Sequence, residues 1–344
     1  SNDKYKGPGE IYKRQVNARI QQDLEGGNFI AASFHFNRNR NNFYRNATEA
    51  QWLANGRNFD NLPLCTRVPG VAGTRQDENA APNAGGTENV LNPSACTNYY
   101  GLRVNPSDTG NIRINSLWNL SDNLRLAIDP SFQYVLANGG GTQLANETPS
   151  ATNNADRRVV GNTTAVGFDL NGDGDVLDTV RFYTPSNTNT KRFGLNASLI
   201  YDMSDTQRLR VAYAFDYGKH RQTGAFGYLD ANGNPENVFG GRQGRVVRTA
   251  DNSFLRTRDR FSIAELNQIS AEYRGKFMDE KLTATIGVRA PFFKRELNQY
   301  CYTQNASGNV LCTTQPVAST LPNGNVRLGT STTEYVPPFK AEAK

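Results

Sequence analysis

The sequence predicts an all-β fold, an antiparallel up-and-down β-sheet of the kind that forms transmembrane barrels. Three observations support this prediction. Eight stretches alternate apolar and polar residues with the period of a β-strand. Short turns and long loops alternate strictly along the chain. Aromatic residues make up 10% of the sequence, with 15 Tyr and 18 Phe, which is more than disordered chains contain.

The alternating stretches supply the expected strands. In the fourth stretch, Leu124, Leu126 and Ile128 share one face, whereas Arg125 and Asp129 share the other. A period of 180° per residue fits all eight stretches, and helical spacing fits none of them well. The stretches are Tyr12–Ile20, Phe29–Phe36, Ile112–Trp118, Leu124–Leu136, Phe193–Tyr201, Leu209–Tyr217, Ile269–Tyr273 and Leu282–Phe292.

The connections between these stretches differ sharply in length. Short turns rich in Asp, Asn, Ser and Gly join the strands in pairs, and the other four connections are long. In an up-and-down sheet, every short turn then falls at one end and every long loop at the other. Soluble domains rarely carry such loops, whereas transmembrane barrels combine short periplasmic turns with long extracellular loops. The long loops are expected at about 43–109, 138–189, 218–260 and 298–330.

The chemistry of the two faces favours a membrane barrel. Hydrophobic residues are only 37% and the mean hydropathy is −0.64, so a thick soluble core would be hard to fill. One face of each strand is apolar, as lipid contact requires, and the other is polar, as a water-filled lumen requires. Aromatic residues near the expected strand ends fit interfacial girdles: Tyr12, Trp118, Tyr201, Tyr217 and Phe292. A secreted β-sandwich with one wet face is the alternative.

Three segments resemble TonB-dependent outer-membrane receptors: LTATIGVRAPFFKRELNQ at 282–299, DLNGDGD at 169–175 and YVPPFK at 335–340. The resemblance implies a plug domain, a segment that contacts TonB and a 22-stranded barrel. No plug-like stretch precedes the first hairpin, and a ninth strand is expected to begin near Glu334. We therefore expect residues 1–344 to form part of one β-barrel domain, about 8–9 of its strands, with the plug domain absent. A complete eight-stranded barrel with large loops is the rival interpretation.

The resemblance also implies a function and a location. It implies an active-transport receptor in the cell outer membrane of a Gram-negative bacterium, energised through TonB, for a scarce solute of the siderophore, cobalamin or oligosaccharide class. The implied partners are outer-membrane lipid, the solute, the plug domain and the TonB system. The net charge of +6 is spread along the chain and gives no reason to expect nucleic acid. With two His, neither beside a candidate nucleophile, we expect no catalytic residues and no required cofactor. A passive porin-like channel remains an alternative.

One long loop contains a candidate calcium site. The sequence DLNGDGDVLD at 169–178 follows the first eight positions of a calcium loop, with alternating oxygen ligands, Gly at the sixth position and an apolar residue at the eighth. The twelfth position is Val180 and not the usual bidentate Glu. Calcium would order an outer loop; an acidic turn with flexible corners is the alternative. The candidate ligands are Asp169, Asn171, Asp173, Asp175 (through its backbone carbonyl) and Asp178.

The four cysteines pair naturally by position. Cys65 and Cys96 both fall in the first long loop, and Cys301 and Cys312 both fall in the last. The sequence contains no CxxC motif and no His nearby, which argues against a metal site. We therefore expect two disulfides, each within one outer loop, as suits an oxidising compartment.

Overall fold

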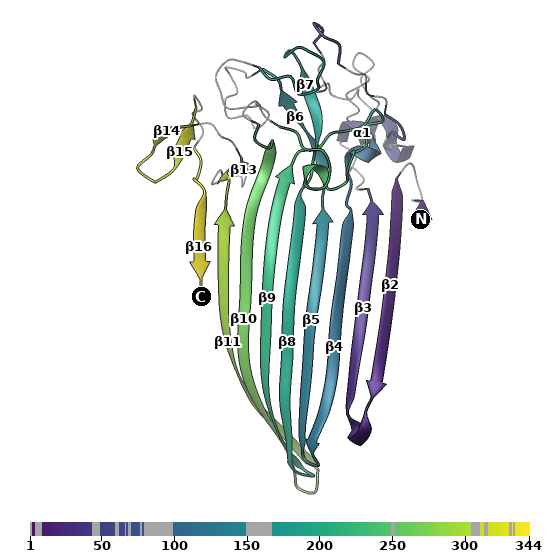
Figure 1. Cartoon of the computed structure of the whole chain (residues 1–344), viewed down its shortest axis with the longest axis vertical. Coiled ribbons are helices and arrows are strands. Elements are labelled where there is room, and N and C mark those ends of the chain that lie inside the picture. Colours follow the sequence, from purple (N-terminus) through teal and green to yellow (C-terminus); the bar gives the residue numbers. More distant parts are fainter. Residues whose placement is uncertain are drawn as a thin grey trace.

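A computed structural model describes residues 2–3, 9–42, 49–58, 62–65, 67, 70–75, 78, 99–148, 167–248, 252–303, 310–312, 316–329, 332 and 334–344. Its main feature is one tall antiparallel sheet (Figure 1). The strands of this sheet, in spatial order, are β1 (Asn2–Asp3), β2 (Glu10–Asp23), β3 (Phe29–Asn41), β4 (Ser107–Ser121), β5 (Leu124–Asn138), β8 (Asn187–Ser204), β9 (Gln207–Ala225), β10 (Arg256–Phe277), β11 (Leu282–Gln299) and β16 (Phe339–Ala343).

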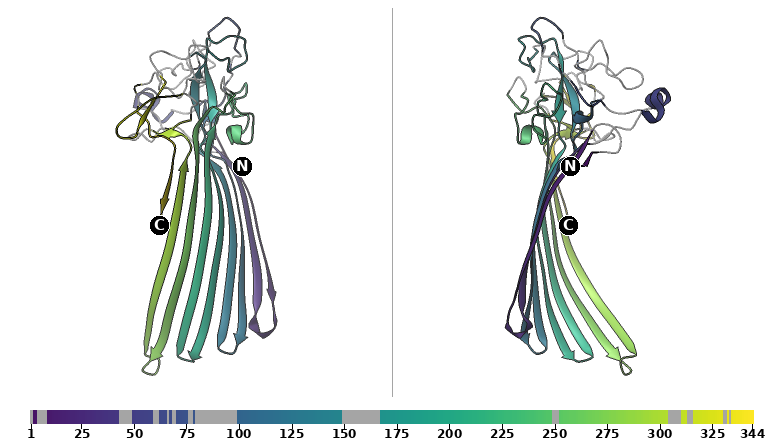
Figure 2. Two further views of the ribbon diagram at one scale, coloured as in Figure 1. Left: turned by 60° about the vertical axis from the view of Figure 1, so that its left-hand side comes forward. Right: turned by 90° about the vertical axis from the view of Figure 1, so that its right-hand side faces the viewer.

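The predicted fold class is confirmed. All eight expected strands form, and neighbours in the sequence pair antiparallel in the sheet. The short turns lie at one end of the sheet and the long connections at the other, here called the turn end and the loop end (Figures 1 and 2). The ninth strand, β16, begins at Phe339 and not near Glu334. β1 and β16 occupy opposite edges, so the described strands form an open, curved wall.

The strands reach further toward the loop end than their apolar pattern predicted. β9 continues past Tyr217 to Ala225, and β10 begins at Arg256, well before the expected start at Ile269. Polar and charged residues occur on both faces in these extensions, so the alternation that marks a strand is lost while the backbone ladder continues. Tyr217 and Phe292, expected near strand ends, therefore lie within their strands.

The apolar face of the sheet is not covered. Ile269, Ile286 and Val288 are 55%, 71% and 69% exposed. Where the chain is described, the loops gather beyond the loop end and form no second layer against this face (Figure 2). This arrangement excludes a β-sandwich within the described chain, because a sandwich requires the two apolar faces to interlock.

The long loops carry structure of their own. The second forms a hairpin of β6 (Gly141–Asn146) and β7 (Thr179–Thr184), and the first contains the helix α1 (Glu49–Asn55). No helix among the described residues is long and apolar enough to cross a bilayer. The remaining small elements are η1 (Glu25–Gly27), η2 (Gly56–Asn58), η4 (Tyr100–Leu102), η5 (Gly240–Arg242), β12 (Tyr302–Thr303), β13 (Val310–Leu311), β14 (Val317–Thr320) and β15 (Val326–Leu328).

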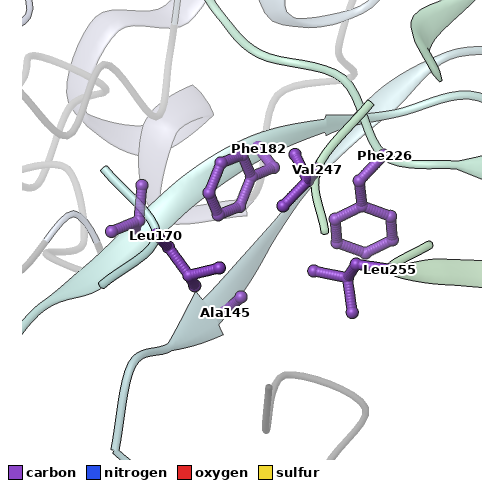
Figure 3. Packing of buried hydrophobic residues seen from close by; sticks show 7 residues of the cluster. Ala145, Leu170, Phe182, Phe226, Val247 and Leu255 are labelled. Carbon is purple, nitrogen blue, oxygen red and sulfur yellow. The ribbon is translucent and has the colours of Figure 1, made fainter. Parts of the chain in front are cut away.

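The largest buried apolar clusters lie in the loops and not on the sheet. We call the described residues within 49–106, 139–186 and 226–255 the loop cap. One cluster joins its second and third loops around Phe182 and Phe226, whose ring centroids lie 6.4 Å apart with the ring planes tilted by 50° (Figure 3). It contains Ala145, Leu170, Val180, Phe182, Phe226, Val247 and Leu255. A second cluster adds the first loop through Cys65, Tyr99, Leu102 and Val104, packed with Tyr183 and Leu229.

Truncating the largest side chain of the first cluster tests whether the loop cap is a packed unit. Phe182 is 1% exposed, so we expect Phe182→Ala to lower the free energy of opening the cap by about 3–5 kcal/mol. Hydrogen exchange of the backbone amides in 139–186 and 226–255 measures this change. Leu177→Ala, in the same loop but 50% exposed, is the control. Equal exchange in the two variants would contradict a packed cap.

Candidate functional site

A cavity of about 820 Å³ opens on the polar face of the sheet, near the loop end. Strands β8, β9, β10 and β11 form its wall, and Phe339 of β16 borders it. The register explains why space is left here. Gly218 of β9 pairs with Ala264 of β10, and these two small residues separate Arg192 from Arg295 along one row of the sheet. The volume falls within the range of small-molecule sites.

The polar groups of the cavity are held in pairs across the strands. The Nδ1 atom of His220 lies 2.7 Å from the hydroxyl of Thr190. Arg192 donates from Nε to the carboxylate of Asp216 at 2.8 Å. Arg260 hydrogen-bonds to the neutral side chain of Gln222. These contacts fix the donors in place and thereby pre-organise the wall for a ligand.

The cavity carries an excess of positive charge. Asp216 neutralises Arg192, but Gln222 leaves the charge of Arg260 uncompensated. Arg295 makes no ion pair with any residue that the structure describes.

Glu265 also borders the cavity, but its carboxylate accepts a hydrogen bond from Asn267, and strand alternation directs both side chains to the other face. The site is therefore suited to an anionic ligand, with Phe293 and Phe339 as apolar contacts.

A buried ion pair holds the loop cap together. Glu78 is fully buried, and both of its carboxylate oxygens accept hydrogen bonds from Arg67 at 3.0 Å. Arg67 also donates to the carbonyl of Leu229 in the third loop, at 2.9 Å. The guanidinium of Arg181, on β7, donates to the backbone carbonyl of Glu78 at 2.8 Å. The pair thus connects three loops, and removing one partner would leave a buried charge. Nothing in the local sequence around Glu78 indicated this role.

The structure divides the predicted calcium ligands into two groups. Asp169 accepts hydrogen bonds from the backbone of Gly172 and Gly174, at 2.6 and 2.9 Å, and so shapes the turn. Asn171 and Asp173 likewise accept from backbone amides within the loop. The second carboxylate oxygen of Asp173 is buried and has no hydrogen-bond partner. These three residues form the acidic turn that was the alternative to a calcium site. The turn does not test calcium binding, which stays a prediction.

The other two predicted ligands meet a residue that sequence reasoning missed. Carboxylate oxygens of Asp175, Asp178 and Glu147 lie within 4.8 Å of one another. Burial raises the pKa of Glu147, although its carboxylate accepts hydrogen bonds from the backbone of Leu170 and Asp178. Asn171 donates to Asp178 at 2.6 Å, which links the two groups. Glu147 precedes the motif by more than twenty residues, so no loop pattern could have included it.

The cysteines of the last loop form a disulfide. Cys301 and Cys312 are bonded, with their Cα atoms 4.6 Å apart, as the spacing led us to expect. Cys65 is also disulfide-bonded and is buried in the second cluster of the loop cap. Cys96 lies outside the described residues, so its pairing with Cys65 stays a prediction.

Calcium binding at the 169–178 loop stays a prediction with a direct test. We expect millimolar Ca²⁺ to slow proteolytic cleavage of this loop, because a bound cation would hold the carboxylates of Asp175, Asp178 and Glu147 together. A chelator should reverse the protection, and Asp178→Asn should abolish it. Asp205→Asn, in a turn at the opposite end of the sheet, is the control. Cleavage that ignores both calcium and chelator would count against the site.

Comparison with known proteins adds a likeness of overall shape. No family model matches the sequence, and no curated protein matches it significantly. Among solved structures, the closed and open forms of the ferric-catecholate import receptor Fiu from E. coli K12 are similar, each with 12% identity and a TM-score of 0.47. The match covers 97% of this chain but 40% and 43% of the two receptor chains. This chain therefore spans about two fifths of the length of the receptors that it resembles.

Proposed function

We propose that this chain forms part of the wall of an outer-membrane barrel that imports a scarce solute by active transport energised through TonB. The observation that carries the proposal is the uncovered apolar face of a sheet whose other face is polar. Such a wall separates hydrocarbon from a wet lumen, as in outer-membrane barrels. The resemblance of three sequence segments to TonB-dependent receptors supplies the transport class and the energy source.

The height of the apolar band supports a membrane crossing. On β8 the outward apolar run covers the nine residues from Phe193 to Tyr201, and a tilted transmembrane strand needs about 9–11 residues. Aromatic residues mark both limits. Phe132, Phe193 and Tyr217 lie in one row toward the loop end, and Tyr201 and Tyr273 lie in one row toward the turn end. These two rows correspond to the aromatic girdles of a barrel.

The polar face supports passage of a solute that carries negative charge. The cavity lined by Arg192, Arg260 and Arg295 opens on this face, close to the loop cap. In the proposed barrel the cap would face the outside, because long loops are extracellular in outer-membrane barrels. A solute captured there would meet the arginines next. We propose an anionic member of the siderophore class, or an acidic oligosaccharide, as the solute.

Uptake by whole cells tests the transport proposal. Cells that express the full-length protein should accumulate a labelled anionic solute from a panel of ferric siderophores, cobalamin and acidic oligosaccharides. Accumulation should cease when a protonophore removes the proton-motive force. A passive channel would continue to equilibrate the solute after the protonophore is added, and that result would refute active transport.

Two arginines of the cavity provide a test at the level of residues. We expect Arg260→Gln combined with Arg295→Gln to weaken binding of the anionic solute at least tenfold, since each charged hydrogen bond contributes about 1.5–3 kcal/mol. Equilibrium binding to the detergent-solubilised protein measures the change. Arg19→Gln, on the polar face of β2 and away from the cavity, is the matched control. Equal loss in both variants would mean that the cavity has no special role.

A pair of adjacent residues tests the orientation of the sheet in the membrane. Ile269 lies in the middle row of the apolar band, and Gln268 lies beside it on the polar face. We expect Ile269→Arg to destabilise the membrane-inserted protein by about 2–4 kcal/mol, because the charge would enter hydrocarbon. We expect Gln268→Arg to destabilise the membrane-inserted protein much less, because its charge would lie on the polar face. Urea unfolding in lipid vesicles measures the stability change of each variant. A larger loss for Gln268→Arg than for Ile269→Arg would contradict the proposal that the apolar face contacts lipid.

A further inference from the structure

Two lysines face each other on the apolar side of the sheet, where the apolar band meets the polar extensions. Lys191 of β8 pairs directly with Lys219 of β9. The row below them, toward the turn end, pairs Phe193 with Tyr217. Both lysines are exposed, and the ammonium of Lys219 lies 5.6 Å from the centroid of the Tyr217 ring. The two charges therefore lie just above an aromatic row, at the edge of the band.

The pairing of Lys191 with Lys219 is unfavourable unless a negative charge lies close to the two ammonium groups. Like charges directly opposite each other on antiparallel strands destabilise a sheet. The residues directly opposite on the flanking strands are uncharged: Tyr134 of β5 is paired with Lys191, and Ile263 of β10 is paired with Lys219. The carboxylate of Glu265, one row further toward the turn end on β10, accepts a hydrogen bond from Asn267. No carboxylate in the described part of the chain forms an ion pair with either lysine.

Other cations on this side of the sheet show the contrast. Lys294 is bound to Glu296 at 2.7 Å, and Arg40 is bound to Asp108 at 2.8 Å. Arg221, two residues beyond Lys219 on β9, is paired with the nearly buried carboxylate of Asp259. Lys191 and Lys219 thus form a site of two uncompensated charges among neighbours that are already neutralised.

We propose that Lys191 and Lys219 together bind the phosphate of an anionic lipid headgroup at the loop-end boundary of the membrane. Headgroup phosphates occur at the height where the apolar band ends, and a phosphate between the two ammonium groups would remove their repulsion. The acyl chains would then lie along the apolar rows below, over Phe193 and Tyr217. This inference rests on the proposed membrane location, and its test separates the two.

Lipid binding to the full-length protein in a neutral detergent tests the inference. Native mass spectrometry would follow titrations with phosphatidylglycerol, phosphatidylcholine and inorganic phosphate. We expect a clear preference for phosphatidylglycerol over phosphatidylcholine. Each lysine near a membrane surface contributes about fivefold to the affinity for anionic lipid, so Lys191→Gln with Lys219→Gln should weaken phosphatidylglycerol binding roughly 25-fold.

Two further variants make the result specific. Lys191→Arg with Lys219→Arg keeps both charges and should keep the preference, whereas Lys294→Gln removes a charge that Glu296 already neutralises and should change it little. An unchanged preference in the double Gln variant would overturn the inference, as would equal competition by inorganic phosphate. A protein that holds neither lipid would instead contradict the membrane location itself.

Discussion

Alternation of side chains across a shared register is the constraint on which the rest of the structure depends. One row of the sheet places Ile128, Ala197, Tyr213, Ile269 and Ala290 side by side, although they come from five strands. A slip of one residue in any strand would turn its apolar set toward the polar face. Because this face buries nothing within the described chain, intramolecular packing cannot be what maintains the pattern. An apolar environment along the whole face can maintain it, and the proposed lipid contact supplies such an environment.

The sheet has two zones along its height, the apolar band and the polar extensions toward the loop end. The side-chain pattern of each zone depends on the surroundings of its two faces. Alternation marks the apolar band, since the two faces meet different surroundings there, and Asn267 of β10 is a polar exception on the apolar face. In the polar extensions toward the loop end, water can reach both faces, so charged residues occur on either side while the backbone ladder continues. The cavity lies in this second zone, where Gly218 and Ala264 leave room between arginines. A cavity of this kind requires strands that extend beyond the apolar band toward the loop end.

Sequence reasoning succeeded where a local pattern carries the information and failed where distant residues meet. Period-two alternation located all eight long strands, and the turn residues located their connections. The polar extensions were missed because no alternation marks them. The core of the loop cap was missed because Phe182 and Phe226 come from different loops, and no local pattern links the two segments. Glu147 was missed for the same reason, since only folding brings it to Asp175 and Asp178.

Alternation also lets neighbouring residues serve separate surfaces. Lys219 and His220 are consecutive on β9, yet the first lies at the boundary of the apolar face and the second lines the cavity on the polar face. Each side of the sheet has uncompensated cations at this height: Lys191 and Lys219 outside, Arg260 and Arg295 inside. An anion that neutralises one set cannot reach the other, because the backbone ladder separates them. In the proposed membrane setting, the same few strands would contact lipid through one face and select a charged solute through the other, and a substitution on one face could alter one property without altering the other.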